Sequence, residues 1–151
     1  MPLLWQQPWR YHRVERLKNV PPIPLSMFQR SKDKLSKSTT DFPFKHPQSF
    51  EDLAGILRYE GPTFIYKHST RCSVSLFAMK RLSLVEVQPG EQWVYIDVVN
   101  QRPMSLALAE ELNVWHESPQ LILVVNGVVK AHGSHHQVTE TTVENWREQY
   151  S

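Results

Sequence analysis

Hydrophobic positions recur along the chain with helical spacing in four places. The faces predicted in this way are Phe50, Leu53, Ala54 and Leu57; Val74, Phe77, Ala78, Leu82 and Val85; Met104, Leu108 and Leu112; and Val143, Trp146 and Tyr150. Ser49, with the carboxylate of Asp52 three residues on, has the form of a helix cap, and Thr139 is expected to cap the last helix. Pro103 suits the first turn of the third helix, and Asn113 is expected to end it.

Short apolar runs bounded by turn residues predict the strands. Three of them are expected to be buried: Thr63–Tyr66, Trp93–Val98 and Gln120–Val125. The third is followed by Asn126-Gly127, a strong hairpin signal, and then by Val128–Ala131. The predicted order of elements is therefore helix, strand, helix, strand, helix, strand, strand, helix.

That order of elements predicts an α/β fold for a domain spanning residues 41–151. Strands separated by a helix form right-handed units with a parallel pair, whereas the hairpin adds an antiparallel side. We expect a small mixed sheet of about four strands flanked by helices.

Composition is consistent with one domain, since the chain has 151 residues and 40% hydrophobic content. The longest apolar run is Leu121–Val125, far short of the roughly 20 residues of a membrane span, and we expect neither a span nor a secretory leader. The single cysteine cannot form an internal disulfide, so a reducing cytoplasm is the expected compartment.

Residues 1–40 differ from the rest in charge. They carry eight Lys and Arg against Glu15 and Asp33, whereas the remaining residues have a net charge of −4. With five prolines among them, we interpret residues 1–40 as a basic, flexible extension. Three explanations compete for this extension: a disordered tail without a role, an electrostatic arm for nucleic acid or membrane headgroups, or sequence upstream of the true translation start. The sparse Lys/Arg spacing disfavours the arm, so we expect no nucleic-acid or membrane partner.

Cys72 lies where the first strand gives way to a helix, and this position predicts a reactive thiol. A helix N-terminus presents unpaired N–H groups and a partial positive charge, which stabilise a thiolate. With Arg71 beside it, the thiol pKa is expected to fall from about 8.5 into the range of roughly 3.5–7.5. A lone cysteine is more often a small buried hydrophobe, but the polar neighbours Arg71, Ser73 and Ser75 favour a nucleophile.

A cysteine at the first strand-to-helix turn of a small mixed sheet is typical of the thioredoxin-like fold. Enzymes with that fold commonly use Cys-x-x-Cys, and here the same spacing reads Cys72-Ser73-Val74-Ser75. Without a second thiol, a mixed disulfide on Cys72 must be released by an external thiol. We expect the Ser75 hydroxyl to hydrogen-bond the thiolate.

Ser118-Pro119 precedes the expected central strand. A cis proline there would place the Ser118 backbone beside Cys72 to pair with substrate, although a proline is also tolerated at the first residue of a strand. Among the histidines, the cluster His132, His135 and His136 is expected to be a surface loop, and we expect no metal site. His68 either tunes the thiol or is exposed at the strand end.

Several separated blocks resemble the monothiol bacilliredoxin family, from about Phe42 to the C-terminus. The blocks are Lys67 to Ser75, Asp97-Val98 with Arg102-Pro103, His116 to Gln120, and Gly133-Ser134-His135. The resemblance implies a thioredoxin-like fold and removal of bacillithiol from S-bacillithiolated proteins, with Cys72 as the attacking residue. It implies bacillithiol as co-substrate, with bacillithiolated proteins and a small thiol as partners. We expect a monomer and no tightly bound cofactor.

The resemblance also directs attention to the residues around Cys72. We expect thiolate stabilisation from Arg71, Ser73 and Ser75. The substrate-binding candidates are Thr70, Ser118, Pro119 and Arg102. Arg71 and Arg102 suit the acidic groups of bacillithiol, although both are equally consistent with solvated surface charges. Ser73 departs from the family, which often has proline there.

Two other functions remain open from the sequence. One is an iron–sulfur cluster carrier in which Cys72 from each of two subunits and two external thiols hold the cluster. The other is a non-enzymatic interaction module whose basic extension does the binding.

Overall fold

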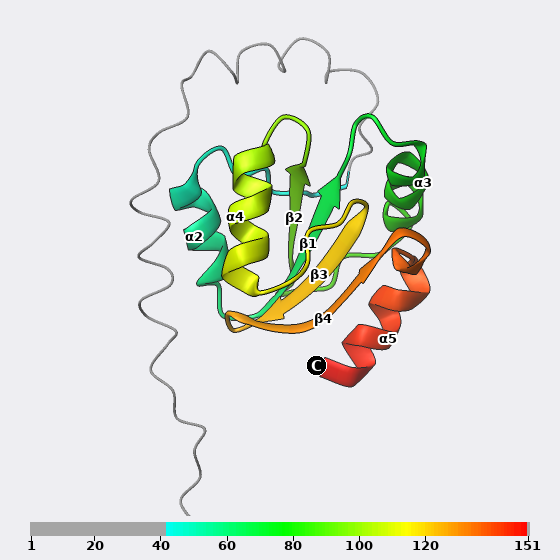
Figure 1. Ribbon diagram of the computed structural model, residues 1–151. Coiled ribbons are helices and arrows are strands. Elements are labelled where there is room, and N and C mark those ends of the chain that lie inside the picture. The colour runs from blue at the N-terminus through cyan, green and yellow to red at the C-terminus, as the bar shows by residue number, and fades with distance from the viewer. Residues whose placement is uncertain (1–41, 151) are drawn as a thin grey trace, which may run out of the picture.

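The computed structural model describes residues 42–150 (Figure 1). The predictions made for residues 1–40 lie outside this part of the chain. The elements, in chain order, are α2 (Phe50–Leu57), β1 (Pro62–His68), α3 (Ser73–Leu82), β2 (Gln92–Asp97), α4 (Arg102–Leu112), β3 (Gln120–Val125), β4 (Val128–Ser134), the 3-10 turn η4 (His135–Gln137) and α5 (Glu140–Tyr150).

The sheet is mixed, with strand order β2-β1-β3-β4. β1 is parallel to β2 through the α3 crossover and antiparallel to β3, which forms a hairpin with β4. Asn126 and Gly127 turn that hairpin with positive φ angles of 52° and 72°, as the sequence predicted. The predicted order of elements and the small mixed sheet are both confirmed.

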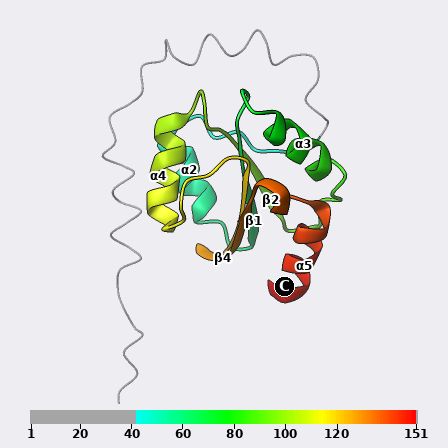
Figure 2. The ribbon, with the colours of Figure 1, turned by 45° about the vertical axis from the view of Figure 1, so that its right-hand side comes forward.

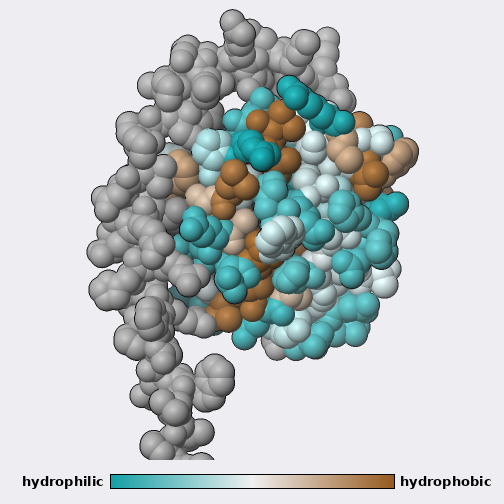
Figure 3. All heavy atoms as spheres, viewed as in Figure 1, coloured by the Kyte–Doolittle hydropathy of each residue, from teal (hydrophilic) through white to brown (hydrophobic). Residues whose placement is uncertain are grey.

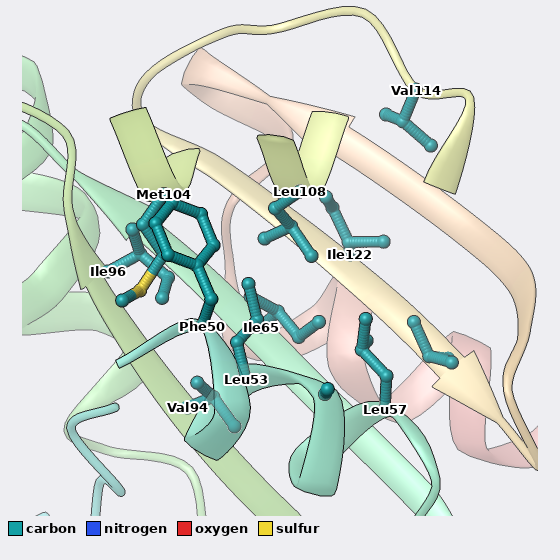
Figure 4. Close-up of a cluster of buried hydrophobic side chains, with 12 residues drawn as sticks. Phe50, Leu53, Leu57, Ile65, Val94, Ile96, Met104, Leu108, Val114 and Ile122 are labelled. Carbon is teal, nitrogen blue, oxygen red and sulfur yellow. The ribbon is translucent and has the colours of Figure 1, made fainter. Parts of the chain in front are cut away.

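Helices cover both faces of the sheet. α2 and α4 lie on one face and α3 and α5 on the other, as Figures 1 and 2 show from two directions. Ile65 of β1 packs among the apolar residues of α2 and α4, and the interior of this core is drawn in Figure 4. Phe64 and Tyr66, its neighbours along β1, point the other way into the core beneath α3 and α5.

Local signals explain where the helices begin and end. Ser49 and Asp52 form the expected capping box of α2, with Asp52 N–H donating to Ser49 Oγ at 3.0 Å. Asn113 ends α4 in the left-handed conformation, with φ 52°. Thr139 Oγ1 accepts from Thr142 N–H at 3.1 Å at the start of α5.

The structure corrects the predicted face of α3. Val74 and Phe77 are 44% and 59% exposed, whereas Ser75 and Ala78 are buried. The exposed apolar side chains of this helix contribute to the brown atoms over α3 at the right of Figure 3. α3 ends at Leu82, so the buried Val85 lies beyond it and is no part of its face. Helical spacing alone did not reveal that a serine, rather than two large apolar residues, faces the sheet.

Two strands are longer than predicted, and both extend toward the same end of the sheet. β1 continues through Lys67 and His68, which are 0% and 4% exposed, and β4 continues to Ser134. Polar residues there made the apolar runs look shorter than the hydrogen-bonded strands. Among the described residues, no helix is long and apolar enough to cross a membrane.

Candidate functional site

Cys72 occupies the cap position of α3, just beyond the C-terminal end of β1. A turn brings the chain there, with Cys72 N–H donating to Ser69 C=O at 3.2 Å, and Cys72 C=O accepts from Leu76 N–H as the helix begins. The cysteine is partly exposed and has no disulfide partner. Its thiol is therefore held at a helix N-terminus within reach of solvent.

The electrostatic surroundings favour the thiolate. The N–H of Ser75 has the largest effect and lowers the pKa of Cys72; burial, the next largest, opposes it, and the N–H of Val74 and the Ser75 hydroxyl add smaller lowering effects. No hydrogen bond of full cap geometry forms to the sulfur, so these groups act by pointing the positive ends of their dipoles toward it. A lowered thiol pKa is the property that makes a cysteine nucleophilic near neutral pH.

Ser75 is fully buried and connects three parts of the site. Its hydroxyl oxygen accepts from Ser69 N–H at 3.2 Å, lies 3.5 Å from Ser118 Oγ, and is one of the groups that lower the pKa of Cys72. At the position where many proteins of this fold carry a second thiol, this chain thus has a hydroxyl that joins the turn, the cysteine and the β3 entrance.

The Ser118-Pro119 peptide bond is cis, as proposed from the sequence. Pro119 C=O accepts from His135 N–H at 2.9 Å, and Glu117 lies 3.7 Å from the His135 ring as an ion pair when that ring is protonated. These contacts tie the loop before β3 to the end of β4. Ser118 and Ser75 thereby come together although 43 residues separate them in the sequence.

Beneath the start of α3, Tyr66 and His68 form a buried pair, of which the sequence left His68 undecided. The Tyr66 hydroxyl donates to Ser75 C=O at 2.8 Å and lies 3.1 Å from His68 Nδ1. Because a phenol has one hydrogen and Ser75 accepts it, His68 Nδ1–H must be the donor in the second contact. Burial lowers the pKa of His68, with Asp97 opposing, and raises the pKa of Tyr66, so both are uncharged near neutral pH. His68 is buried, and the alternative of an exposed strand-end histidine was wrong.

Four other predicted residues lie on the surface around this site. Thr70, Arg71, Ser73 and Arg102 are all exposed. Arg71 and Ser73 are not among the groups that lower the Cys72 pKa, and their stabilising role stays a prediction. Arg102, the first residue of α4, is close enough to His116 to help lower the pKa of that histidine.

The histidines near the end of β4 form no metal centre with their neighbours. His132, His135 and His136 are exposed, and within residues 42–150 no group of three or more His, Cys, Asp or Glu side chains could hold a metal ion.

About two thirds of the chain matches a known family. Residues 43–143 match the family described as monothiol bacilliredoxin BrxC. The chain belongs to the monothiol bacilliredoxin family. Membership makes it a thiol redox protein, and the match includes the whole of the site around Cys72.

Solved structures support the fold of this bacilliredoxin family member. It is similar to a suspected oxidoreductase with a thioredoxin fold, at 24% identity and a TM-score of 0.62, over 68% of this chain and 91% of that one. It is also similar to mitochondrial thioredoxin 3 from Saccharomyces cerevisiae, at 16% identity and a TM-score of 0.56, over 70% and 94%. A thioredoxin from Trypanosoma brucei brucei matches at 12% identity and a TM-score of 0.58, over 70% and 88%. The predicted thioredoxin-like fold is confirmed.

Sequence reasoning missed the buried polar residues that support the site. Tyr66 was predicted only as the last residue of a buried strand, and Lys67 was placed beyond that strand. The signal that was available is the alternation of β1: when the strand is extended by two residues, Tyr66 and His68 fall on one face and Lys67 on the other.

Proposed function

We propose that this chain removes bacillithiol from S-bacillithiolated proteins by a one-cysteine cycle. The observation that carries the proposal is Cys72 itself, a partly exposed thiol with a lowered pKa and a hydroxyl, Ser75, in place of a second thiol. Family membership supports the choice of bacillithiol as the small thiol.

In the first step, the Cys72 thiolate attacks the bacillithiol sulfur of the mixed disulfide. A Cys72–bacillithiol disulfide forms, the bond to the protein substrate's sulfur breaks, and that sulfur leaves as a thiolate that takes a proton from solvent. The lowered pKa of Cys72 supplies the attacking thiolate near neutral pH.

In the second step, the thiolate of another bacillithiol attacks the bacillithiol sulfur of this adduct. Bacillithiol disulfide forms and Cys72 leaves as a thiolate, so the net reaction converts the mixed disulfide and one free bacillithiol into the protein thiol and bacillithiol disulfide. Ser75 has no sulfur with which to attack the adduct from within, which supports an external thiol as the resolving group.

We assign substrate contacts to residues that border the cysteine. Ser118, before the cis Pro119, would pair through its backbone with the extended chain on either side of the disulfide, and the exposed Thr70, two residues before Cys72, would contact the same substrate. Arg71 and Arg102 suit the acidic groups of bacillithiol. We propose a monomer without a tightly bound cofactor, working in a reducing cytoplasm.

The test uses a protein carrying one bacillithiol mixed disulfide, followed by intact-mass spectrometry. We expect the parent to free the substrate and to gain one bacillithiol on Cys72, and Cys72→Ser to do neither. Ser83→Ala, at the far end of α3, is the matched control and should act like the parent. The same substrate carrying glutathione tests the choice of small thiol. Removal of bacillithiol by Cys72→Ser at the parent's rate would refute the cycle.

A further inference from the structure

Lys67 is a buried lysine to which the proposed chemistry gives no task. Its side chain is fully buried on the α4 face of the sheet, opposite to Tyr66, and among the described residues no carboxylate forms an ion pair with it. A buried ammonium without an ion-paired carboxylate costs free energy, so the hydrogen bond that it does make must have a structural reason.

That bond reaches the loop before β3. Lys67 Nζ lies 2.8 Å from Nδ1 of His116. Burial, with Lys67 and Arg102 nearby, lowers the pKa of His116, and burial lowers the pKa of Lys67 to about 8, with Glu117 opposing. Near neutral pH the ammonium therefore donates to an unprotonated Nδ1, and His116 carries its own proton on Nε2.

A second buried side chain holds the same loop from the neighbouring strand. Gln120 of β3 is the register partner of Lys67, is also fully buried, and donates from Nε2 to Trp115 C=O at 2.8 Å. Its Oε1 is buried without a partner among the described residues, so the amide bears a desolvation cost for this one bond. Adjacent positions on two paired strands thus hold two consecutive loop residues.

The α4 helix completes the arrangement. Ser105 Oγ, fully buried, lies 3.4 Å from the same Nδ1 of His116. Two residues further along the chain is Ser118, whose hydroxyl is 3.5 Å from Ser75 beside the nucleophile. The loop that borders Cys72 is therefore fixed at its base by β1, β3 and α4.

We propose that Lys67 is a positioning residue, which acts through His116 to hold the loop of residues 113–119 in the place where Ser118 and Pro119 meet the substrate. Gln120 does the same through Trp115. The inference rests on the proposed function, since it assigns to this loop the task of aligning the mixed disulfide for Cys72. It goes beyond that function by assigning a role to Lys67, which lies on the opposite face of the sheet from Tyr66 and Ser75.

The test separates loop order from chemistry. Lys67→Met keeps the length of the side chain and removes the donor, and His116→Leu removes the acceptor. His116→Asn keeps an acceptor, Oδ1, near the place of Nδ1. Lys45→Met is the matched control, because Lys45 bonds Gln92 at the opposite end of the sheet.

The first readout is backbone NMR order, which needs no substrate. In Lys67→Met and His116→Leu we expect the order parameters of Trp115, His116 and Ser118 to fall from about 0.85 toward about 0.6, the range of flexible backbone. His116→Asn and Lys45→Met should keep parent values. Unchanged loop order in both Lys67→Met and His116→Leu would overturn the inference.

The second readout is steady-state kinetics with the bacillithiolated protein. Loss of a hydrogen bond from a charged donor predicts a KM raised about tenfold or more in Lys67→Met and in His116→Leu. His116→Asn, which keeps an acceptor, should have the KM of the parent. The rate of Cys72 alkylation by iodoacetamide should equal that of the parent, because Lys67 is not among the groups that set the Cys72 pKa. An unchanged KM would contradict the inference, whereas a parent inactive on this substrate would contradict the proposed function and leave the NMR result to decide the role of Lys67.

Discussion

Tyr66 and Lys67 are neighbours in sequence that serve one site from opposite faces of the sheet. Tyr66 points beneath α3 and bonds Ser75 C=O, in the first turn of the helix that carries the nucleophile. Lys67 points beneath α4 and bonds His116, in the loop that borders the nucleophile. Both side chains are fully buried and each makes its bond with a polar head at the end of a long side chain.

The difference between the two faces is one of charge. On the α3 face the buried groups are kept neutral, since burial raises the pKa of Tyr66 and lowers that of His68. On the α4 face an ammonium is buried against a histidine, with a pKa of about 8. The neutral face holds the first turn of the helix that carries the thiol, and the charged face holds the loop. Because successive side chains of β1 point to opposite faces of the sheet, one strand supplies a residue to each of these two roles.

On the charged face, the expected change in stability is a gain. Lys67→Met removes an ammonium whose pKa is about 8 when folded and about 10.4 when unfolded, a difference worth about 3 kcal/mol. The lost bond to His116 offsets part of this gain, so we predict that the variant is more stable by about 1–2 kcal/mol at pH 7 in urea unfolding. A variant less stable than the parent would contradict the account of Lys67 as a costly residue kept for position.

The pH dependence of that gain has a definite sign. Because the folded pKa is lowered, the unfolded parent binds more protons between about pH 8 and pH 10.4, and parent stability rises with pH across this window. The advantage of Lys67→Met should therefore be constant below pH 8 and shrink above it. An advantage that grows with pH would reverse the predicted sign.

On the neutral face, Tyr66→Phe leaves Ser75 C=O and His68 Nδ1–H without their buried partner. We predict a loss of about 1–2 kcal/mol in the free energy of unfolding, measured by urea denaturation. Tyr95→Phe is the matched control, because Tyr95 is a buried tyrosine of β2 in ring contact with His68, and no bond from its hydroxyl holds α3. Equal losses of unfolding free energy in both variants would mean that the hydrogen bond to Ser75 C=O adds nothing to stability beyond that of any buried tyrosine hydroxyl.

A smaller effect sharpens the comparison between the faces. The hydrogen bond of the Tyr66 hydroxyl and that of the Lys67 ammonium share no partner. The stability changes of Tyr66→Phe and Lys67→Met should therefore add within about 0.5 kcal/mol in the double variant. Urea unfolding of the two single variants and the double variant completes the cycle. A coupling energy clearly above that value would show that the faces communicate through β1.

Much of the fold followed from the sequence because its signals are local. The Ser49 cap, the Asn126-Gly127 turn and the apolar run of β3 each determine backbone geometry without distant partners. The placement of Cys72 at a helix start followed from the same signals.

What the sequence did not reveal depends on distant contacts. Lys67 and His116 meet across 49 residues, and nothing in either local pattern distinguishes a buried lysine from a solvated one. Val74 and Phe77 suggested a core-facing helix surface, but the small Ser75 faces inward because its hydroxyl has partners on the Ser69 turn and the Ser118 loop. Packing and hydrogen bonding from outside the segment decided both cases.

The most direct test of the divided site is the ultraviolet titration of the Cys72 thiolate in three proteins: the parent, Ser75→Ala and Lys67→Met. We predict that Ser75→Ala raises the thiol pKa only partly, because it removes the hydroxyl, the smallest of the groups that lower this pKa, and keeps the Ser75 N–H, the largest. We predict that Lys67→Met titrates with the parent. A midpoint that moves in Lys67→Met, or that stays in place in Ser75→Ala, would contradict the assignment of the thiolate to one face and of the loop to the other.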